Sequence, residues 1–162
     1  MERKYTIAQF IKLCDFIRKK SPNASITTDY IIGFPSETQT QFLESIENLK
    51  KIKFANIHMF PFSLHKDTKA AAIKQVFTEK EKQNRYEMIK KINEECKAIY
   101  LKSFLNKIVN VLFEHPKNPN IQNGKSQYYF DVFVSTKKNL QNSLLKVKVT
   151  SFRDGKLFGK IM

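Results

Sequence analysis

The sequence of 162 residues contains no tryptophan, only two cysteines and only three histidines. The cysteines, Cys14 and Cys96, are too few for a disulfide framework and too far apart in the sequence for a local metal site. No apolar run approaches the roughly 18–20 residues that span a bilayer, and the N-terminal segment MERKYTIAQF lacks the apolar core of a secretion signal. These absences predict a soluble, cytoplasmic protein with two reduced thiols on helices.

Acidic residues are scarce as well, because 29 basic side chains face only 15 acidic ones and the formal net charge is +14. Residues 104–162 hold 10 basic and 3 acidic side chains, whereas residues 1–103 hold 19 and 12. A positive excess of this size favours nucleic acid as a partner. A lysine-rich genome is the alternative explanation, and it accounts less well for the dense positive charge of the second part.

The first two thirds of the chain follow the pattern of a parallel α/β protein. Apolar residues recur at helical spacing in TIAQFIKLCDFIRKK, in the segment from Phe42 to Leu49, and in TEKEKQNRYEMIKKINEECKAIYLKSF. Two further segments are typical of strands: SITTDYIIGF, expected to be buried, and FANIHMF. Capping boxes predict where the three helices begin, at Thr6 with Gln9, Ser36 with Gln39 and Thr78 with Glu81.

The pattern changes after about residue 105 to four short segments of alternating polarity: KIVNVLFE, QYYFDVFVS, LLKVKVTSF and KLFGKIM. Turn residues separate them, in NPNIQNGKS, TKKNLQNS and RDG. We therefore predict an α/β domain at residues 1–104, followed at residues 105–162 by a small all-β barrel or strongly bent sheet of four or five strands.

Two clusters of residues follow the predicted strands, and α/β folds build ligand sites at the carboxyl ends of parallel strands. In the first, TTDYIIGFPSET, Gly33 would let a ligand approach the backbone, although Gly-x-Pro-Ser equally serves to end a strand and cap a helix. Glu37 suits the first helical turn without any catalytic duty. In the second, HMFPFSLHKDT, His58 is expected in the core, while His65 and Lys66 meet an anion or only solvent. The sequence contains no phosphate loop and no complete catalytic or metal-ligating arrangement.

The second part of the chain interleaves cations with aromatic residues, a pattern typical of small barrels that neutralise phosphates and stack bases. Lys146 and Lys148 alternate with Val147 and Val149, which predicts a row of cations on the solvent face of one strand. The alternative is that the aromatic residues fill the core and the lysines only keep the module soluble. The predicted RNA-binding residues are Lys125, Lys137, Lys138, Lys146, Lys148, Arg153 and Lys156. The pattern further includes Lys107, Lys117, Lys160, Tyr128, Tyr129, Phe130, Phe133, Phe152 and Phe158.

Three segments, in order, resemble parts of one enzyme family. MERKYT is similar to its Met-x-Arg-x-Tyr-Thr segment, ITTDYIIGFPSETQTQF to its Thr-Asp-x-Ile-x-Gly-Phe-Pro-Gly-Glu-Thr-x-x-x-Phe stretch, and HMFPFSLHKDTKAA to its Phe-Pro-Tyr-Ser-x-Arg-x-Gly-Thr-x-Ala segment. The chain thus resembles the C-terminal portion of the radical-SAM tRNA methylthiotransferases. The resemblance implies an α/β fold, the C-terminal part of a radical-SAM partial (β/α) barrel, followed by a small all-β, OB-like TRAM barrel that contacts tRNA.

For the intact family, the resemblance implies S-adenosylmethionine and 4Fe-4S clusters as cofactors. It implies addition of a methylthio group to C2 of a modified adenosine next to the anticodon of tRNA, and the forms of MERKYT and HMFPF slightly favour threonylcarbamoyladenosine. This chain has neither the three cysteines of the family's cluster-binding domain nor its Cys-x-x-x-Cys-x-x-Cys motif. We therefore expect a truncated, split or excised piece of a longer protein that is inactive alone. The alternative is a non-catalytic RNA-binding protein that uses only the TRAM-like module. A third and weaker hypothesis is that the chain pairs with a separately encoded N-terminal half.

The resemblance also assigns residues to the rim that binds S-adenosylmethionine and substrate. These cofactor-binding residues are Gly33, Phe34, Pro35, Glu37, Phe60, Pro61 and Ser63. Two departures from the family pattern affect this rim, because Ser36 replaces a glycine and Leu64-His65-Lys66-Asp67 replaces a turn of the Pro-Arg-Pro-Gly type. No residue is assigned a catalytic or metal-binding role.

Overall fold

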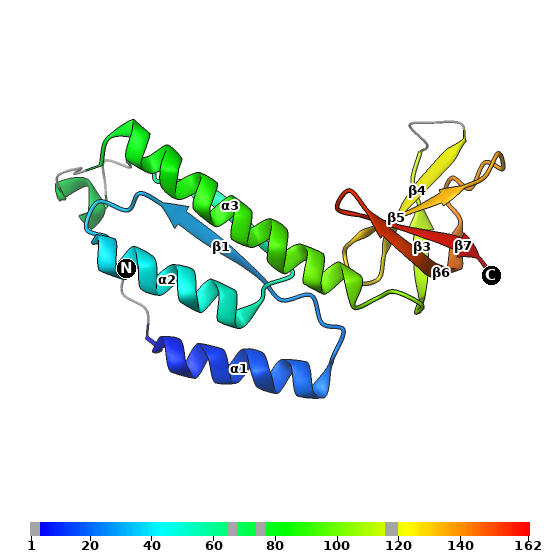
Figure 1. The fold of residues 1–162 in the computed structure, drawn as a ribbon, viewed down its shortest axis with the longest axis horizontal. Helices are drawn as coiled ribbons and strands as arrows, with labels where there is room; N and C mark the ends of the chain where they lie inside the picture. Colours follow the sequence, from blue (N-terminus) through cyan, green and yellow to red (C-terminus); the bar gives the residue numbers. More distant parts are fainter. Residues whose placement is uncertain (1–3, 65–67, 74–76, 116–119) are drawn as a thin grey trace. The chain divides into compact units, whose positions relative to one another are not determined.

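The computed structural model describes residues 4–64, 68–73, 77–115 and 120–162, and it divides into two compact units (Figure 1). The helical unit contains residues 1–22 and 26–96, and the barrel unit contains residues 23–25 and 97–162. Each helix in the described ranges is too short or too polar to cross a membrane.

The helical unit alternates helices with two strands. Its elements are α1 (Ile7–Lys20), β1 (Thr27–Ile32), α2 (Gln39–Ile52), β2 (Asn56–Pro61), a 3-10 turn (Lys69–Ala72) and α3 (Glu79–Lys102), whose last residues belong to the barrel unit. The two strands pair in parallel, from Thr27 opposite Asn56 to Ile32 opposite Pro61. The predicted order of helix, strand, helix, strand and helix is confirmed, and both strands end at the same edge of the sheet.

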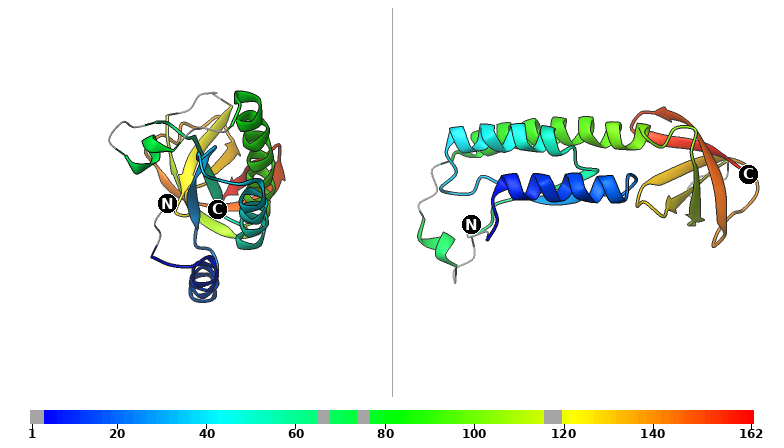
Figure 2. Two further views of the ribbon diagram at one scale, coloured as in Figure 1. Left: turned by 90° about the vertical axis from the view of Figure 1, so that its left-hand side faces the viewer. Right: turned by 90° about the horizontal axis from the view of Figure 1, so that it is seen from below.

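The apolar faces of the three helices form the core of the helical unit. Figure 1 and Figure 2 show α1 running alongside α2. Both cysteines are free and buried in this core, Cys14 on α1 and Cys96 on α3. The other buried members are Phe42, Ile46, Leu49, Ile52, Phe54, Ile57, Ile89 and Ile92.

One helix start differs from its prediction. The capping box of α2 is formed by Thr38 and Gln41, not by Ser36 and Gln39. Both pairs have the same spacing, and the turn at residues 33–37 delays the helix by two residues, so the sequence rule alone does not separate them. The other two boxes are confirmed, at Thr6 with Gln9 and at Thr78 with Glu81.

The expectation that β1 is a buried strand is wrong for most of its length. Ile32 is buried, whereas Thr27 and Asp29 are exposed. A parallel strand is buried only when other strands flank it and helices cover both faces. In the described residues, the sheet of the helical unit consists of β1 and β2 alone.

The barrel unit contains a closed five-stranded barrel. Its strands are β3 (Ile108–Phe113), β4 (Ile121–Ser126), β5 (Asp131–Ser135), β6 (Leu144–Arg153) and β7 (Lys156–Ile161). They are arranged in the order β3-β4-β5-β7-β6, and β6 pairs back with β3. Four pairs are antiparallel, and β5 and β7 are parallel. The prediction of a small all-β barrel is confirmed.

Strand β4 lies in IQNGKS, a segment that the sequence pattern assigns to a turn, and that assignment is wrong. The strand turns Gln122 and Ser126 inward, where they are 2% and 5% exposed. Gln122 Oε1 accepts a hydrogen bond from the backbone N of Leu140 at 3.4 Å, and Ser126 Oγ accepts one from that of Phe130 at 3.3 Å. Because the inward side chains are polar but hydrogen-bonded, hydrophobic alternation does not reveal this strand.

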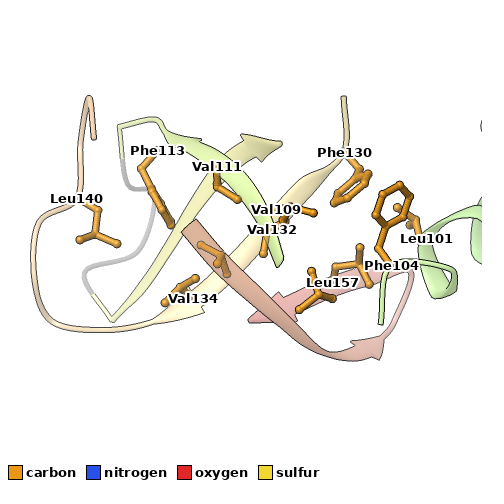
Figure 3. Packing of buried hydrophobic residues seen from close by; sticks show 12 residues of the cluster. Leu101, Phe104, Val109, Val111, Phe113, Phe130, Val132, Val134, Leu140 and Leu157 are labelled. Carbon is orange, nitrogen blue, oxygen red and sulfur yellow. The ribbon is translucent and has the colours of Figure 1, made fainter. Parts of the chain in front are cut away.

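An apolar cluster fills most of the barrel core, beside the buried Gln122 and Ser126 (Figure 3). Phe104 and Phe130 face each other at one end, with ring centroids 4.5 Å apart, and Phe113 and Leu140 lie toward the other end. Between them lie the valines of β3 and β5 and Leu157, and Val147 and Val149 of β6 belong to the same cluster. The interpretation that aromatic residues fill the core therefore holds for part of the aromatic set.

Candidate functional site

The ends of β1 and β2 bring the two predicted rim segments together. The backbone N of Phe62 donates a hydrogen bond to the carbonyl of Ile32 at 2.8 Å, so the β2 end lies against the start of the Gly33 turn. The rings of Phe34 and Phe62 meet edge to face, with centroids 5.5 Å apart and an interplanar angle of 83°. The rim is therefore aromatic at the point where the strands end.

The position of Gly33 favours glycine, chiefly through its backbone conformation. Its φ of +76° lies in the left-handed region, which other residues rarely adopt. A Cβ added to Gly33 would also lie 3.1 Å from Cγ of Lys82 on α3, whose side chain is 18% exposed and pairs with Glu79. The methylene groups of Lys82 therefore occupy the space beside this glycine.

Glu37 does not lie in the first helical turn, because α2 begins at Gln39. Its carboxylate forms an ion pair with the guanidinium of Arg85, and these side chains are only 15% and 7% exposed. Tyr30 Oη donates a hydrogen bond to the same carboxylate at 3.4 Å. Burial raises the pKa of Glu37, and the nearby positive charge of Arg85 opposes that rise. Glu37 therefore connects the turn after β1 to α3.

Arg85 is the residue of this site that sequence reasoning missed. Its guanidinium carbon lies 4.5 Å from the ring centroid of Phe42 and 4.1 Å from that of Phe77, and Nη2 donates to Gln39 Oε1 at 3.2 Å. Only the planar guanidinium can stack on two rings and bind two acceptors at once. The sequence feature that could have pointed to Arg85 is the rarity of arginine, since the sequence has 4 arginines and 25 lysines.

The remaining rim residues differ in exposure. Phe60 is 51% exposed on β2, Pro61 and Ser63 are exposed, and Pro35 is buried. His58 is also exposed, so the expectation of a core histidine is wrong: its position on β2 turns away from the core, and its ring lies 3.3 Å from Nδ2 of Asn56. The candidates His65, Lys66 and Asp67 lie outside the described residues.

Tyr30 offers a test of this buried cluster by pH. Burial, and then the negative charge of Glu37, raise the pKa of Tyr30 from 10.0 to about 12. Because the folded state holds this proton more tightly, the resulting stabilisation is present below pH 10 and is lost as the pH rises through about 12. We expect the free energy of unfolding, measured with denaturant, to fall less between pH 10 and about pH 12 in Tyr30→Phe than in the unmodified chain. Equal losses in the two proteins would show that the phenol does not titrate as the cluster requires.

The predicted row of cations is present on the outer face of the barrel. Lys146 and Lys148 are exposed on β6, and Val147 and Val149 between and beside them are fully buried. Lys148 lies opposite Lys160 of β7 in the strand register. Two like charges directly opposite each other repel, so this face favours an anion that lies between them.

The other predicted cations are placed in several ways. Lys125 pairs with Asp131 across β4 and β5 at 2.6 Å, so its charge is partly neutralised. Arg153 lies 4.6 Å above the ring of Phe158, and Lys156 lies 5.4 Å above that of Phe133. Lys137 and Lys138 are exposed in the segment that follows β5, and Lys117 is outside the described residues.

Three aromatic residues of the pattern differ in what they contact. Phe130 is buried in the barrel core, and Tyr128 packs against that core. Tyr129 is 83% exposed and has a φ of +64°, an unusual backbone conformation for a bulky residue. Only part of the aromatic set is therefore available to a ligand.

The cysteines do not fit a metal cluster. Burial raises the pKa of both thiols, which favours the protonated form that does not bind metal. Within the described ranges, no three His, Cys, Asp or Glu side chains gather where they could hold a metal ion.

Comparisons with known proteins find relatives along the whole chain. A scan against protein-family models finds no match. The tRNA-2-methylthio-N(6)-dimethylallyladenosine synthase of Fusobacterium nucleatum is 31% identical over 164 aligned residues, which cover 100% of this chain and 38% of the relative. The enzyme of that name from Malacoplasma penetrans is 35% identical, over 100% of this chain and 33% of the relative. The threonylcarbamoyladenosine tRNA methylthiotransferase of Thermotoga maritima is 33% identical, over 80% of this chain and 30% of the relative. The chain thus spans about a third of the length of these relatives.

Proposed function

We propose that the barrel of this chain binds tRNA for a methylthiotransferase. The premise is that the chain belongs to the tRNA methylthiotransferases and matches their C-terminal part. The observation that carries this proposal is the row of exposed lysines on β6 and β7 in a chain whose relatives are named for acting on tRNA. Residues 105–162 would be the RNA-binding module, and residues 1–104 the closing part of the catalytic barrel.

The rim would supply part of the surface for S-adenosylmethionine. The edge-to-face pair Phe34 and Phe62, the half-exposed Phe60 and the exposed Ser63 suit a nucleoside, because they combine apolar rings with a hydroxyl. In the intact family, by the resemblance stated above, this cofactor is both radical source and methyl donor. Glu37 would hold the turn in place rather than bind the cofactor, because its carboxylate is used by Arg85.

An iron-sulfur cluster does not fit the residues of this chain, because its two cysteines are buried and burial raises the pKa of both thiols. Catalysis would need the family's cluster-binding part, which a longer form of this protein or a separately encoded N-terminal half would supply. The modified nucleoside would be an adenosine next to the anticodon, and the forms of MERKYT and HMFPF slightly favour threonylcarbamoyladenosine. Relatives with either name match at similar identity, 31% and 33%.

A second candidate function is RNA binding without catalysis. The same exposed lysines favour it. The ion pair with Arg85 also favours it, because it leaves the Glu37 carboxylate with a structural role rather than a cofactor-binding one. Adding a candidate N-terminal half distinguishes the two functions. Methylthio transfer to tRNA by the pair supports the enzyme, whereas binding of tRNA without product supports the alternative.

Replacing Lys146 and Lys148 together with alanine tests the barrel's role. Each phosphate contact contributes about 0.7–0.9 to the slope of log affinity against log salt, so the double variant should lower that slope by about 1–2 and weaken tRNA binding. The matched control is Lys50→Ala with Lys51→Ala, which removes two exposed lysines from α2. The proposed face is wrong if both double variants change the slope equally, or if neither does.

A further inference from the structure

A groove on the outside of the barrel has the size and lining of a nucleotide site. It lies over β5, β6 and β7 and has a volume of about 510 Å³. This falls within the roughly 300–1,000 Å³ of typical small-ligand sites. The described residues that line it include Phe133, Phe158, Lys138, Arg153 and Lys160. Four hydroxyl side chains also line it, and none of these described lining residues is acidic.

Irregular strand pairing shapes this groove. The β5 and β7 strands pair over only three residues, Val132–Val134 with Leu157–Gly159. The register of β6 against β7 shifts between Val149 and Ser151, which marks a β-bulge. A bulge redirects the side chains beside it, and both Thr150 and Ser151 line the groove.

The two aromatic rings of the groove lie side by side. The centroids of Phe133 and Phe158 are 5.7 Å apart, with an interplanar angle of 39°, and both rings are partly exposed. Arg153, which lines the groove, lies over the ring of Phe158, and Lys156, which does not line it, lies over that of Phe133, so each cation covers one face of its ring and a base would stack on the other. The groove therefore combines an apolar platform with fixed positive charges.

This combination distinguishes between forms of RNA. A double helix presents phosphates and 2′-hydroxyl groups outward and keeps its base faces stacked inside. A single strand offers both phosphates and free base faces, which stack on aromatic side chains. A cationic groove alone would suit either form, but partly exposed rings within it favour the single strand.

We propose that this groove binds an unpaired nucleotide of a single-stranded RNA segment, with its base on Phe133 and Phe158 and its phosphates on Arg153, Lys138 and Lys160. The proposal deepens, and rests on, the proposed RNA-binding function of the barrel. It adds Phe133, Phe158 and Lys160 to the predicted RNA-binding set, and it continues the cationic row, because Lys160 lies opposite Lys148 of β6.

The test uses the full chain and three RNA probes of about eight nucleotides, a length within the usual range for small barrels. The probes are a single strand, the duplex of the same sequence, and a strand of equal length that carries abasic sites. The variant Phe133→Leu with Phe158→Leu keeps apolar side chains but removes the rings. Its control is Phe16→Leu, which removes an exposed ring of α1 that lies outside the barrel and does not line the groove.

We expect the double variant to bind the single strand about 5- to 150-fold more weakly, the range for loss of one stacked base, with an unchanged salt slope. Duplex affinity and the control variant should be unaffected. If the double variant fails to fold, the unmodified chain still tests the proposal, because it should prefer the single strand to the abasic strand by a similar factor. Equal affinity for those two strands, or an equal loss for single strand and duplex, would overturn it.

Failure of this proposal is distinguishable from failure of the proposed function. If the chain binds tRNA and the Lys146 and Lys148 variant weakens that binding, but the abasic strand binds as well as the intact one, only the groove proposal is wrong. If no RNA probe and no tRNA binds even at low salt, both are wrong.

Discussion

Replacing Arg85 with alanine is expected to lower the free energy of unfolding of the helical unit by about 3–5 kcal/mol. The substitution leaves the Glu37 carboxylate, only 15% exposed, without its counter-ion, and it removes the planar cation between Phe42 and Phe77. The loss is a large fraction of the roughly 5–15 kcal/mol that stabilises a typical domain. Denaturant unfolding followed by helical circular dichroism measures it.

Two further variants show whether the ion pair itself causes the loss. Arg18→Ala is the matched control, because Arg18 makes one exposed hydrogen bond to the carbonyl of Lys53, which contributes about 1 kcal/mol or less. Combining Arg85→Met with Glu37→Gln should restore much of the stability, since a buried pair replaced as a whole costs less than one broken in half. If Arg85→Ala costs no more than Arg18→Ala, the buried pair does not hold this unit together.

Replacing Gly124 with alanine is expected to unfold the barrel while leaving the helices in place. A Cβ on Gly124 would lie 2.4 Å from the carbonyl oxygen of Leu112 and 2.7 Å from Cγ1 of Val111. Because the first of these atoms is backbone in the paired strand β3, relief requires β3 and β4 to separate. Overpacking costs about 1–3 kcal/mol and sometimes more, and a barrel of this size has little stability to spare.

The matched control for this substitution is Gly155→Ala. Gly155 has a φ of +72°, and a Cβ added there would meet open space, with nothing within 4 Å beyond its chain neighbours. Only backbone strain of about 1–2 kcal/mol therefore opposes the change. Amide hydrogen exchange should show barrel protection lost in Gly124→Ala and retained in Gly155→Ala. Because the proposed RNA site lies on the barrel, tRNA binding should follow the same pattern. Retained binding by an unfolded barrel would place the RNA site elsewhere.

The helices and the shared rim were predictable from local rules. Helical spacing and capping boxes place α1 and α3, and the carboxyl ends of two parallel strands must meet at one edge. The rule failed at α2 because two boxes of equal spacing overlap, at Ser36 and at Thr38. The turn at residues 33–37, which packs against the end of β2, places the helix start at Thr38, and the spacing of the capping box does not.

Features that depend on distant partners could not be predicted. Strand β4 is hidden because Gln122 and Ser126 are buried through hydrogen bonds rather than through apolar contacts. The partner of Glu37 is 48 residues away at Arg85, and no local pattern connects them. In the barrel, alternation predicted the exposed row at Lys146 and Lys148, but not which aromatic rings remain accessible.

The most direct test of the central claim is tRNA binding by the unmodified chain as a function of salt, compared with a non-cognate RNA of equal length. We predict tighter binding to tRNA and a steep fall in affinity with salt, at about 0.7–0.9 in logarithmic slope for each phosphate contacted. No binding at low salt, or equal affinity for both RNAs, would contradict the assignment of this chain as the tRNA-binding part of a methylthiotransferase.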